Sequence, residues 1–97
     1  MSVEYEWDDA KAAANLQKHG VAFDEALTAF ADPLARIFDD PDHSEDEPRE
    51  IIVGFSAQSR LLLIGFTERS GRVDLIHARR ATKSEREHHE ENVKPKP

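Results

Sequence analysis

The chain of 97 residues contains no cysteine, and this absence excludes several kinds of site. A disulfide framework, a thiolate nucleophile and a zinc site with cysteine ligands all need residues that the sequence lacks. Long apolar runs are missing too, and the charged start MSVEYEWDDAKAAANLQKHG has no apolar stretch of the kind found in a secretory signal. We therefore expect a soluble, cytoplasmic protein that does not contact a membrane.

Positive charge is scarce, and most of it lies in the second half of the chain. There are 13 Lys and Arg residues against 20 Asp and Glu, so the net charge is −7. Residues 1–57 carry 14 acids and 4 bases, a net of −10, whereas the remainder carries 6 acids and 9 bases, a net of +3. Overall acidity disfavours non-specific binding to nucleic acid, because neutralising phosphates requires local positive potential. A local basic cleft could still provide that potential in an acidic protein.

The pattern of apolar residues predicts an α+β fold of one domain, residues 1–93, followed by a disordered tail, 94–97. A short strand is expected at residues 3–7. Asp8 is expected to cap a first helix that ends at Gly20, and Pro33 is expected to stop a second helix that starts near Phe23. The later strands are expected in LARIF, EIIVGFS, RLLLIGFTE and RVDLIHARR. This order favours an antiparallel sheet with the helices mostly on one face.

The last helix, KSEREHHEENV, is introduced by a capping box of Thr82 and Glu85. It has almost no apolar face, so we expect it to be exposed or held by a partner. In the strand before it, strict alternation would place Val73, Leu75, His77 and Arg79 on one face, and Arg72, Asp74, Ile76, Ala78 and Arg80 on the other. Two adjacent arginines on a strand must therefore point in opposite directions.

Several polar residues could form a site for RNA cleavage. Without a metal, this reaction needs a base for the 2′-hydroxyl, an acid for the leaving oxygen and cations for the phosphate charge. The suitable residue types are His19, His77, Glu68, Arg69, Arg79 and Arg80. Lys11, Asn15, Lys18 and His19 share one stripe of the first helix, which is either a solvated face or a ridge beside a cleft. The spacing alone is a weak signal, because arginines on a sheet rim more often form structural ion pairs.

Metal sites fit the sequence less well. Glu85 and His89 are one helical turn apart beside His88, but an exposed polar helix offers few groups to orient such ligands. The acidic run from Asp39 to Glu47 lacks the glycine and the terminal glutamate spacing of an EF-hand. We therefore expect no metal and no cofactor.

Three stretches, EWDDAKAAANLQKHGVAFDEALTAFADP, DPDHSEDEPRE and LLLIGFTERSGRVDLIHARRATKSERE, together resemble the BrnT family of bacterial toxins over residues 4 to about 87. The pieces that carry the resemblance are Trp7-Asp8, Lys11, Asn15, Lys18-His19-Gly20, Asp32-Pro33, the TER of residues 67–69 and the ARRAT of residues 78–82. The resemblance implies a fold like the RelE-type toxins, with two N-terminal helices packed on the sheet and a C-terminal helix.

The resemblance also implies a function, which is metal-independent RNA cleavage that inhibits translation. It implies a BrnA-like antitoxin with a ribbon-helix-helix part, which would neutralise the toxin in a hetero-oligomer, expected to be 2:2. The pair would repress its own operon, and the chain would reach DNA only through that complex. The rival hypothesis is a non-catalytic acidic module, or a degenerate toxin, that only docks a basic partner.

From the basic hairpin and the family pattern, we expect Arg79 and Arg80 to stabilise phosphate charge, and Glu68 or His19 to transfer the proton. The residues expected to bind RNA are Lys11, Lys18, Arg60, Arg69 and Lys83. Two positions differ from the family pattern: His77 stands where a small polar residue is usual, and Asp74 where a basic residue is usual. The resemblance therefore assigns His77 no role.

Overall fold

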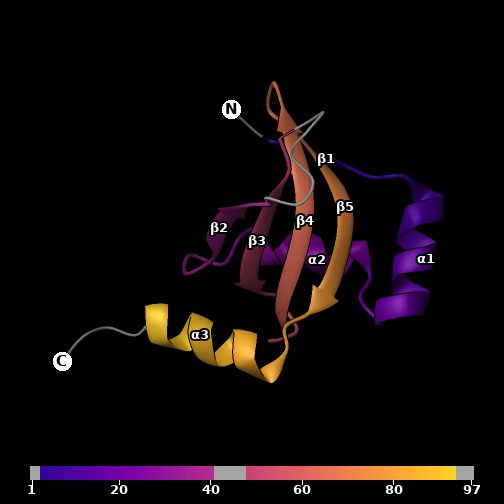
Figure 1. Ribbon diagram of the computed structural model, residues 1–97. Helices are drawn as coiled ribbons and strands as arrows, with labels where there is room; N and C mark the ends of the chain where they lie inside the picture. Colours follow the sequence, from indigo (N-terminus) through magenta and orange to yellow (C-terminus); the bar gives the residue numbers. More distant parts are fainter. Residues whose placement is uncertain (1–2, 41–47, 94–97) are drawn as a thin grey trace.

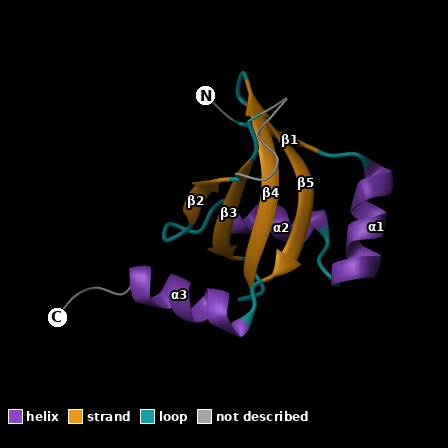
Figure 2. Cartoon of the chain, in the orientation of Figure 1, coloured by secondary structure: helices purple, strands orange, loops and turns teal. Residues whose placement is uncertain are grey.

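The structure is a computed structural model that describes residues 3–40 and 48–93. In this part of the chain, one five-stranded sheet has the strand order β1-β5-β4-β3-β2 and is accompanied by three helices (Figures 1 and 2). The elements are β1 (Glu4–Glu6), α1 (Asp9–His19), α2 (Phe23–Ala29), β2 (Arg36–Asp39), β3 (Glu50–Phe55), β4 (Leu61–Arg69), β5 (Arg72–Arg80) and α3 (Lys83–Val93). The predicted α+β class is confirmed.

The pairing of the strands is antiparallel from β2 through β5, because each link between them is shorter than the crossover that parallel neighbours need. β1 differs, because it runs parallel to β5, with Glu4 opposite Arg72. The sheet is therefore mixed, whereas the sequence predicted a purely antiparallel one. β1 and β5 are far apart in the chain, so no hairpin fixes their relative direction.

The first two helices form where the sequence places them. Asp8 caps α1 by accepting a hydrogen bond from the backbone N–H of Lys11 at 3.1 Å, and Gly20 ends the helix with φ 69°. α2 packs across β3, β4 and β5, and α1 lies beside β5 (Figure 1). The core between α2 and the sheet comprises Val21, Phe23, Ala26, Ala29, Ile52, Leu62, Ile64, Phe66, Val73, Leu75 and Ala78.

A β-bulge in β5 decides which side chains face this core. Gly65 of β4 pairs with His77, but Phe66 pairs with Leu75, so Ile76 is an extra residue. Both Leu75 and Ala78 are consequently buried on the α2 side, although they are three residues apart. The predicted alternation is therefore wrong beyond Leu75. His77 lies on the face opposite to that of Val73 and Leu75, which we call the open face.

α3 follows β5 at the lower edge of the open face (Figure 2). Its capping box forms as predicted, since Glu85 accepts the Thr82 N–H at 2.8 Å and the Thr82 hydroxyl accepts the Glu85 N–H at 3.1 Å. His89 is buried and packs edge-on against Phe55, while most other described side chains of α3 are exposed. None of the helices in the described residues is long and apolar enough to cross a membrane.

Candidate active site

A cavity of about 370 Å³ opens on the open face near the β4–β5 turn. Its lining residues are Glu6, Lys11, Arg49, Thr67, Arg69, Arg72, Asp74 and Ile76. Four of these side chains are cationic and two are acidic, in a chain whose net charge is −7. The cavity thus concentrates positive charge where the molecule as a whole has little.

Several elements bring these cations together. Lys11 comes from the first turn of α1, and Arg49 precedes β3, where its carbonyl oxygen accepts the Asp40 N–H at 2.9 Å. Arg69 and Arg72 flank a tight turn in which Ser70 and Gly71 both adopt positive φ, 50° and 82°. Lys11 and Arg69, both predicted to bind RNA, therefore line the same cavity. The structure places two further cations, Arg49 and Arg72, in that lining.

Glu6 and Asp74 in the lining, with Glu4 next to them, moderate the charge of the cavity. Glu6 lies 3.2 Å from an Nη of Arg72, and Glu4 lies 3.7 Å from its Nε. Both pairs are solvent-exposed, so water and salt screen them strongly. Asp74 stands in the wall opposite Glu6 on the neighbouring strand. Asp74, which stands where the resemblance leads us to expect a basic residue, is thus part of the cavity itself.

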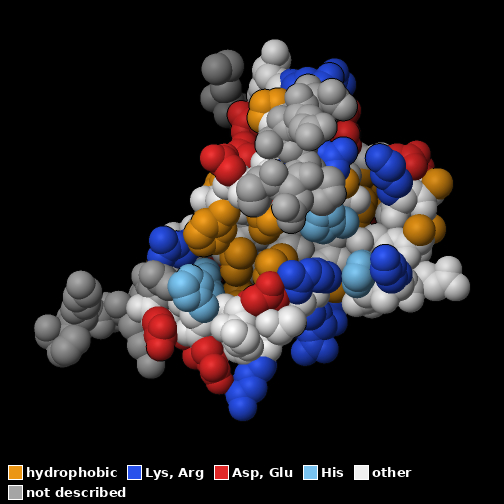
Figure 3. Space-filling model, viewed as in Figure 1, with side chains coloured by type: hydrophobic (Ala, Val, Ile, Leu, Met, Phe, Trp, Pro, Cys, Tyr) orange, Lys and Arg blue, Asp and Glu red, His pale blue; other side chains and the backbone are white. Residues whose placement is uncertain are grey.

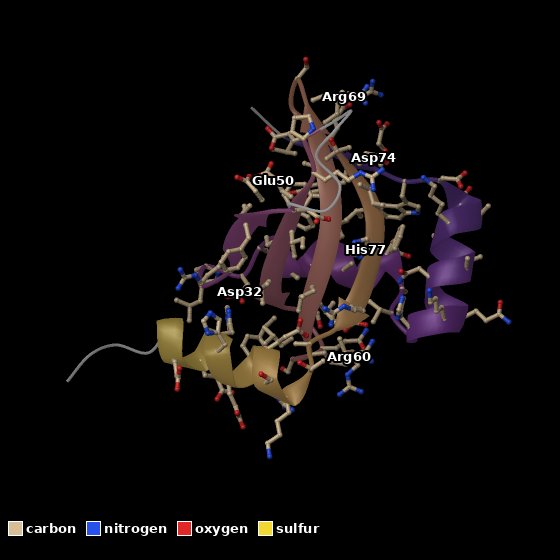
Figure 4. The ribbon with its side chains drawn as sticks, in the orientation of Figure 1. Asp32, Glu50, Arg60, Arg69, Asp74 and His77 are labelled. Atoms are coloured by element: carbon tan, nitrogen blue, oxygen red, sulfur yellow. The ribbon has the colours of Figure 1, made fainter. Side chains whose placement is uncertain are left out.

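His77 lies beside this cavity, further along β5 (Figure 4). Its imidazole ring covers Gly65 so closely that a Cβ at Gly65 would stand 2.3 Å from the His77 Nε2. Only glycine leaves room for the ring at this position. The His77 side chain is half-buried, so one part of it is packed against the sheet and another part is open to solvent.

Arg79 is the next residue of β5 on the open face, and it pairs with Glu85. Its Nη1 and Nη2 donate to the two carboxylate oxygens of Glu85, each at 2.8 Å. This two-point bond, helped by the Thr82 backbone N–H, holds the pKa of Glu85 at about 2. Arg79 is therefore neutralised by the start of α3 in this conformation.

Arg80 points to the other side of the sheet, as the alternation of two adjacent arginines predicts. It is opposite Leu62, a core residue, and its charge contributes to lowering the pKa of Glu25 on α2. His19 lies at the same level, because α1 and β5 run in the same direction and Asn15 contacts Ala78 (Figure 1). His19 is one helical turn beyond Asn15, and Arg80 is two strand residues beyond Ala78. Each step advances the chain by about 6 Å.

Arg60 does not fit its predicted role as an RNA ligand. Its Nε donates to Glu25 Oε2 at 2.8 Å, one Nη donates to Glu25 Oε1, and the same Nη donates to the Gly20 carbonyl at 3.1 Å. Glu25 is buried, also accepts from the Ser56 hydroxyl at 2.7 Å, and has its pKa lowered mainly by Arg60. Arg60 therefore joins the β3–β4 turn to α2 as a structural ion pair.

Glu68 is likewise separated from the arginines that it was predicted to assist. It pairs with Val73, whereas Arg79 and Arg80 pair with Leu63 and Leu62. At about 3.3 Å per residue, Glu68 lies about 20 Å from Arg80. It also lies on the face of β4 that Leu62, Ile64 and Phe66 share, away from the open face. Glu68 cannot act on the same phosphate as Arg79 or Arg80 in this arrangement.

The remaining predicted residues lie at the lower end of the molecule. Lys18 is exposed in the last turn of α1, and Lys83 is the exposed first residue of α3. Figure 3 shows Lys, Arg and His side chains on the side of the open face towards β5 and α1, and hydrophobic side chains over β2, β3 and β4. The basic groups thus extend from the cavity to the end of β5.

Asn15 has a role that sequence reasoning missed. Its side chain is buried, and its amide donates to the Ala78 carbonyl at 2.8 Å and to the Val21 carbonyl at 3.0 Å, while its oxygen accepts the Ala78 N–H at 3.0 Å. β1 is too short to pair with this part of β5, so Asn15 replaces a neighbouring strand. It fixes the strand segment that carries His77 and Arg79. In the sequence, Asn15 belongs to the polar stripe of the helix and to the family pattern, and neither predicted that its side chain is buried.

A second cavity, of about 440 Å³, lies between the open face and α3. It is lined by Ile51, Val53 and Leu63 of the sheet, with Arg36, Phe38, Ser84, Glu85, His88 and His89 around them. In the described residues, no group of three or more His, Asp or Glu side chains is arranged to hold a metal ion. Residues 41–47 of the acidic run and the predicted disordered tail, 94–97, lie outside the described residues.

The mixed α+β sheet has a counterpart among solved structures. The crystal structure of the Brucella abortus ribonuclease toxin BrnT matches with a TM-score of 0.66, covering 84% of this chain and 100% of that chain. The sequence identity is 20%, so this likeness establishes the fold. A search of curated proteins found no match.

The family follows from a separate comparison. The sequence model described as "Ribonuclease toxin, BrnT, of type II toxin-antitoxin system" matches residues 7–85, most of the chain. The protein therefore belongs to the BrnT family, the ribonuclease toxins of type II toxin–antitoxin systems.

Proposed function

We propose that this protein is an endoribonuclease toxin that cleaves RNA in the cytoplasm without a metal ion, and so inhibits translation. One observation carries the proposal beyond family membership: four cationic side chains surround a single cavity in an acidic molecule. Such local positive potential draws the phosphate backbone to one face, while the acidic remainder repels it.

In this proposal the cavity holds the RNA backbone. Lys11 and Arg69 contact phosphates together with Arg49, and Arg79 supplies charge next to the scissile phosphate once RNA competes with Glu85 for its guanidinium group. Arg80, His19, Lys18 and Lys83 lie near the end of β5, where the RNA would leave the open face. Glu68 and Arg60 are not included, because one is distant and the other is held by Glu25.

The proposal also includes an antitoxin partner. A BrnA-like protein with a ribbon-helix-helix part would neutralise the toxin in a 2:2 complex and bring it to the operator DNA. Support comes from the exposed acids of α3, which include Glu87, Glu90 and Glu91 and suit a basic partner. In such a complex the DNA contacts come from the partner, which is compatible with the net charge of −7.

Expression in bacteria tests the proposed activity. We expect growth arrest and loss of mRNA when the chain is expressed alone, and recovery when the neighbouring gene is co-expressed. Purified protein should cleave single-stranded RNA equally well with and without EDTA. Arg69→Ala should reduce cleavage by about 10- to 100-fold if it removes one phosphate-stabilising cation. Arg86→Ala removes an exposed arginine of α3 and serves as the matched control, with wild-type cleavage expected.

A docking module without activity remains the second candidate. The observation that favours it is that Arg60, Arg72 and Arg79 each have a carboxylate partner, so their charge is already balanced. A protein that binds its partner tightly but leaves growth and RNA unchanged when expressed alone would establish this second function and refute the first.

A further inference from the structure

We propose that His77 is the general base of the RNA cleavage, although the family resemblance gives this residue no role. The inference rests on the proposed ribonuclease function and identifies the group that takes the proton. It is drawn from the bulge in β5, from the glycine under the imidazole ring and from the charged groups on either side.

The bulge places His77 on the open face. With regular alternation, His77 would share the face of Leu75, which is almost fully buried against α2. The extra residue, Ile76, turns His77 to the opposite side while Ala78 still reaches the core. Bulges often re-aim one side chain next to an active site, and here the re-aimed side chain is an imidazole.

Gly65 fixes where the imidazole lies. Any larger residue at this position would bring its Cβ within 2.3 Å of the His77 Nε2 and within 2.7 Å of its Cδ2. β4 otherwise carries large apolar residues through this region, including Leu63 and Ile64. β4 thus gives up side-chain packing at the position that the His77 ring covers.

Charged groups of both signs face His77 from the surrounding elements. On β5, Asp74 lies on one side and Arg79, paired with Glu85 of α3, on the other. The cavity next to Asp74 adds Arg69 and Arg72 from the hairpin, Arg49 from the start of β3, and Lys11 from α1 with Glu6 from β1. RNA held in that cavity and extending towards Arg79 must pass over His77, which lies between them on the same strand.

The chemistry needs no further reactant. Neutral His77 takes the proton of the 2′-hydroxyl as the 2′-oxygen forms a bond to the adjacent phosphorus. The bond from phosphorus to the 5′-oxygen breaks, leaving a 2′,3′-cyclic phosphate on one fragment. The departing 5′-oxygen takes a proton from solvent and becomes a hydroxyl, and the imidazolium then releases its proton to solvent. No atom changes oxidation state, and the cations balance the charge of the phosphorane.

Two single variants and their combination test the role. His77→Asn removes the base and keeps a polar side chain of similar reach, and it should lower single-turnover cleavage of a defined single-stranded RNA by about 100-fold. Gly65→Ala keeps the imidazole but displaces it, and should also lower the rate. In the double variant, Gly65→Ala should add no further loss, because the imidazole it displaces is already absent.

The pH profile separates a base from a merely structural residue. The wild-type rate should rise with pH through the range near 6.5 in which an imidazole loses its proton. This limb should be absent in His77→Asn and in His77→Ser, the second variant being used if the first does not fold by circular dichroism. Wild-type protein that cleaves RNA, together with variants that keep its rate and its pH limb, would overturn the role of His77 alone. Wild-type protein that cleaves no RNA would overturn the proposed function and this inference with it.

Discussion

Asn15 of α1 bonds both backbone groups of Ala78 in β5, its amide at 2.8 Å from the carbonyl oxygen and its oxygen at 3.0 Å from the amide nitrogen. A side chain thus takes the place of a neighbouring strand at the edge of the sheet. The segment that it fixes lies between His77 and Arg79, so the helix and the candidate active site depend on the same buried amide.

We expect Asn15→Ala to lower the free energy of unfolding by about 3 kcal/mol, because the N–H and the carbonyl of Ala78 both lose their partner in a buried place. Urea denaturation measures this. The control is Gln17→Ala, which removes an exposed amide from the same helix and should change stability by less than about 0.5 kcal/mol. Equal losses in the two variants would show that the bonds to Ala78 do not hold the sheet edge.

Glu85 joins the cap of α3 to Arg79, a candidate active-site residue. Glu85→Gln weakens both bonds to Arg79 and the bond to the Thr82 N–H, so we expect a loss of about 1 kcal/mol. In the same variant Arg79 becomes available to phosphate. RNA binding should therefore tighten although the protein is less stable, and a fluorescence titration with single-stranded RNA measures this. Weaker RNA binding in a folded Glu85→Gln protein would argue against phosphate contact by Arg79.

The low pKa of Glu85 makes this contact sensitive to acid. Its pKa is about 2 in the folded protein and 4.5 without these interactions, so folding favours the charged carboxylate. The stabilisation is complete above pH 4.5 and is lost as the pH falls from about 4.5 towards 2. The difference in melting temperature between wild type and Glu85→Gln should therefore shrink over this range. A constant difference would show that Glu85 is not charged and bonded as described.

Arg60→Ala should destabilise the protein strongly at pH 7, because it leaves the buried carboxylate of Glu25 without its cation. The pKa of Glu25 is lowered chiefly by Arg60. The Arg60→Ala protein should therefore lose more stability at neutral pH, where the Glu25 carboxylate is charged, than at acid pH. Adding Glu25→Gln should recover part of the loss in denaturation midpoint.

The same double variant tests whether Arg60 contacts RNA. Folded Arg60→Ala/Glu25→Gln protein should cleave RNA at close to the wild-type rate, since neither residue lies on the open face. A loss of cleavage as large as that of Arg69→Ala, with the fold intact, would show that Arg60 contacts RNA.

Arg49 was not predicted to bind RNA, and its place in the cavity leads us to propose that it does. We expect Arg49→Ala to weaken binding to single-stranded RNA and to lower the slope of log affinity against log salt by about 0.7, the value for one lost phosphate contact. Measuring binding at several salt concentrations gives the slope. An unchanged slope, equal to that of Arg86→Ala, would show that Arg49 does not contact phosphate.

Local features of the fold could be read from neighbouring residues. Asp8 and Gly20 bound α1, and Thr82 with Glu85 starts α3, because caps act over three or four residues. The sequence alone could not show the bulge at Ile76, because the bulge appears only in how β5 pairs with β4. Nor could it show that Glu68 lies about 20 Å from Arg80, because the hairpin register sets that separation.

The sequence by itself determined the elements, their order, the charge imbalance and, through the match over residues 7–85, the BrnT family. Short-range chemistry is sufficient for these. Only the tertiary structure decided that Lys11, Arg49, Arg69 and Arg72 share one cavity, that Glu25 engages Arg60, and that His77 lies across Gly65. Each of these depends on contacts between residues far apart in the chain, which are fixed when the sheet selects its register and buries one face.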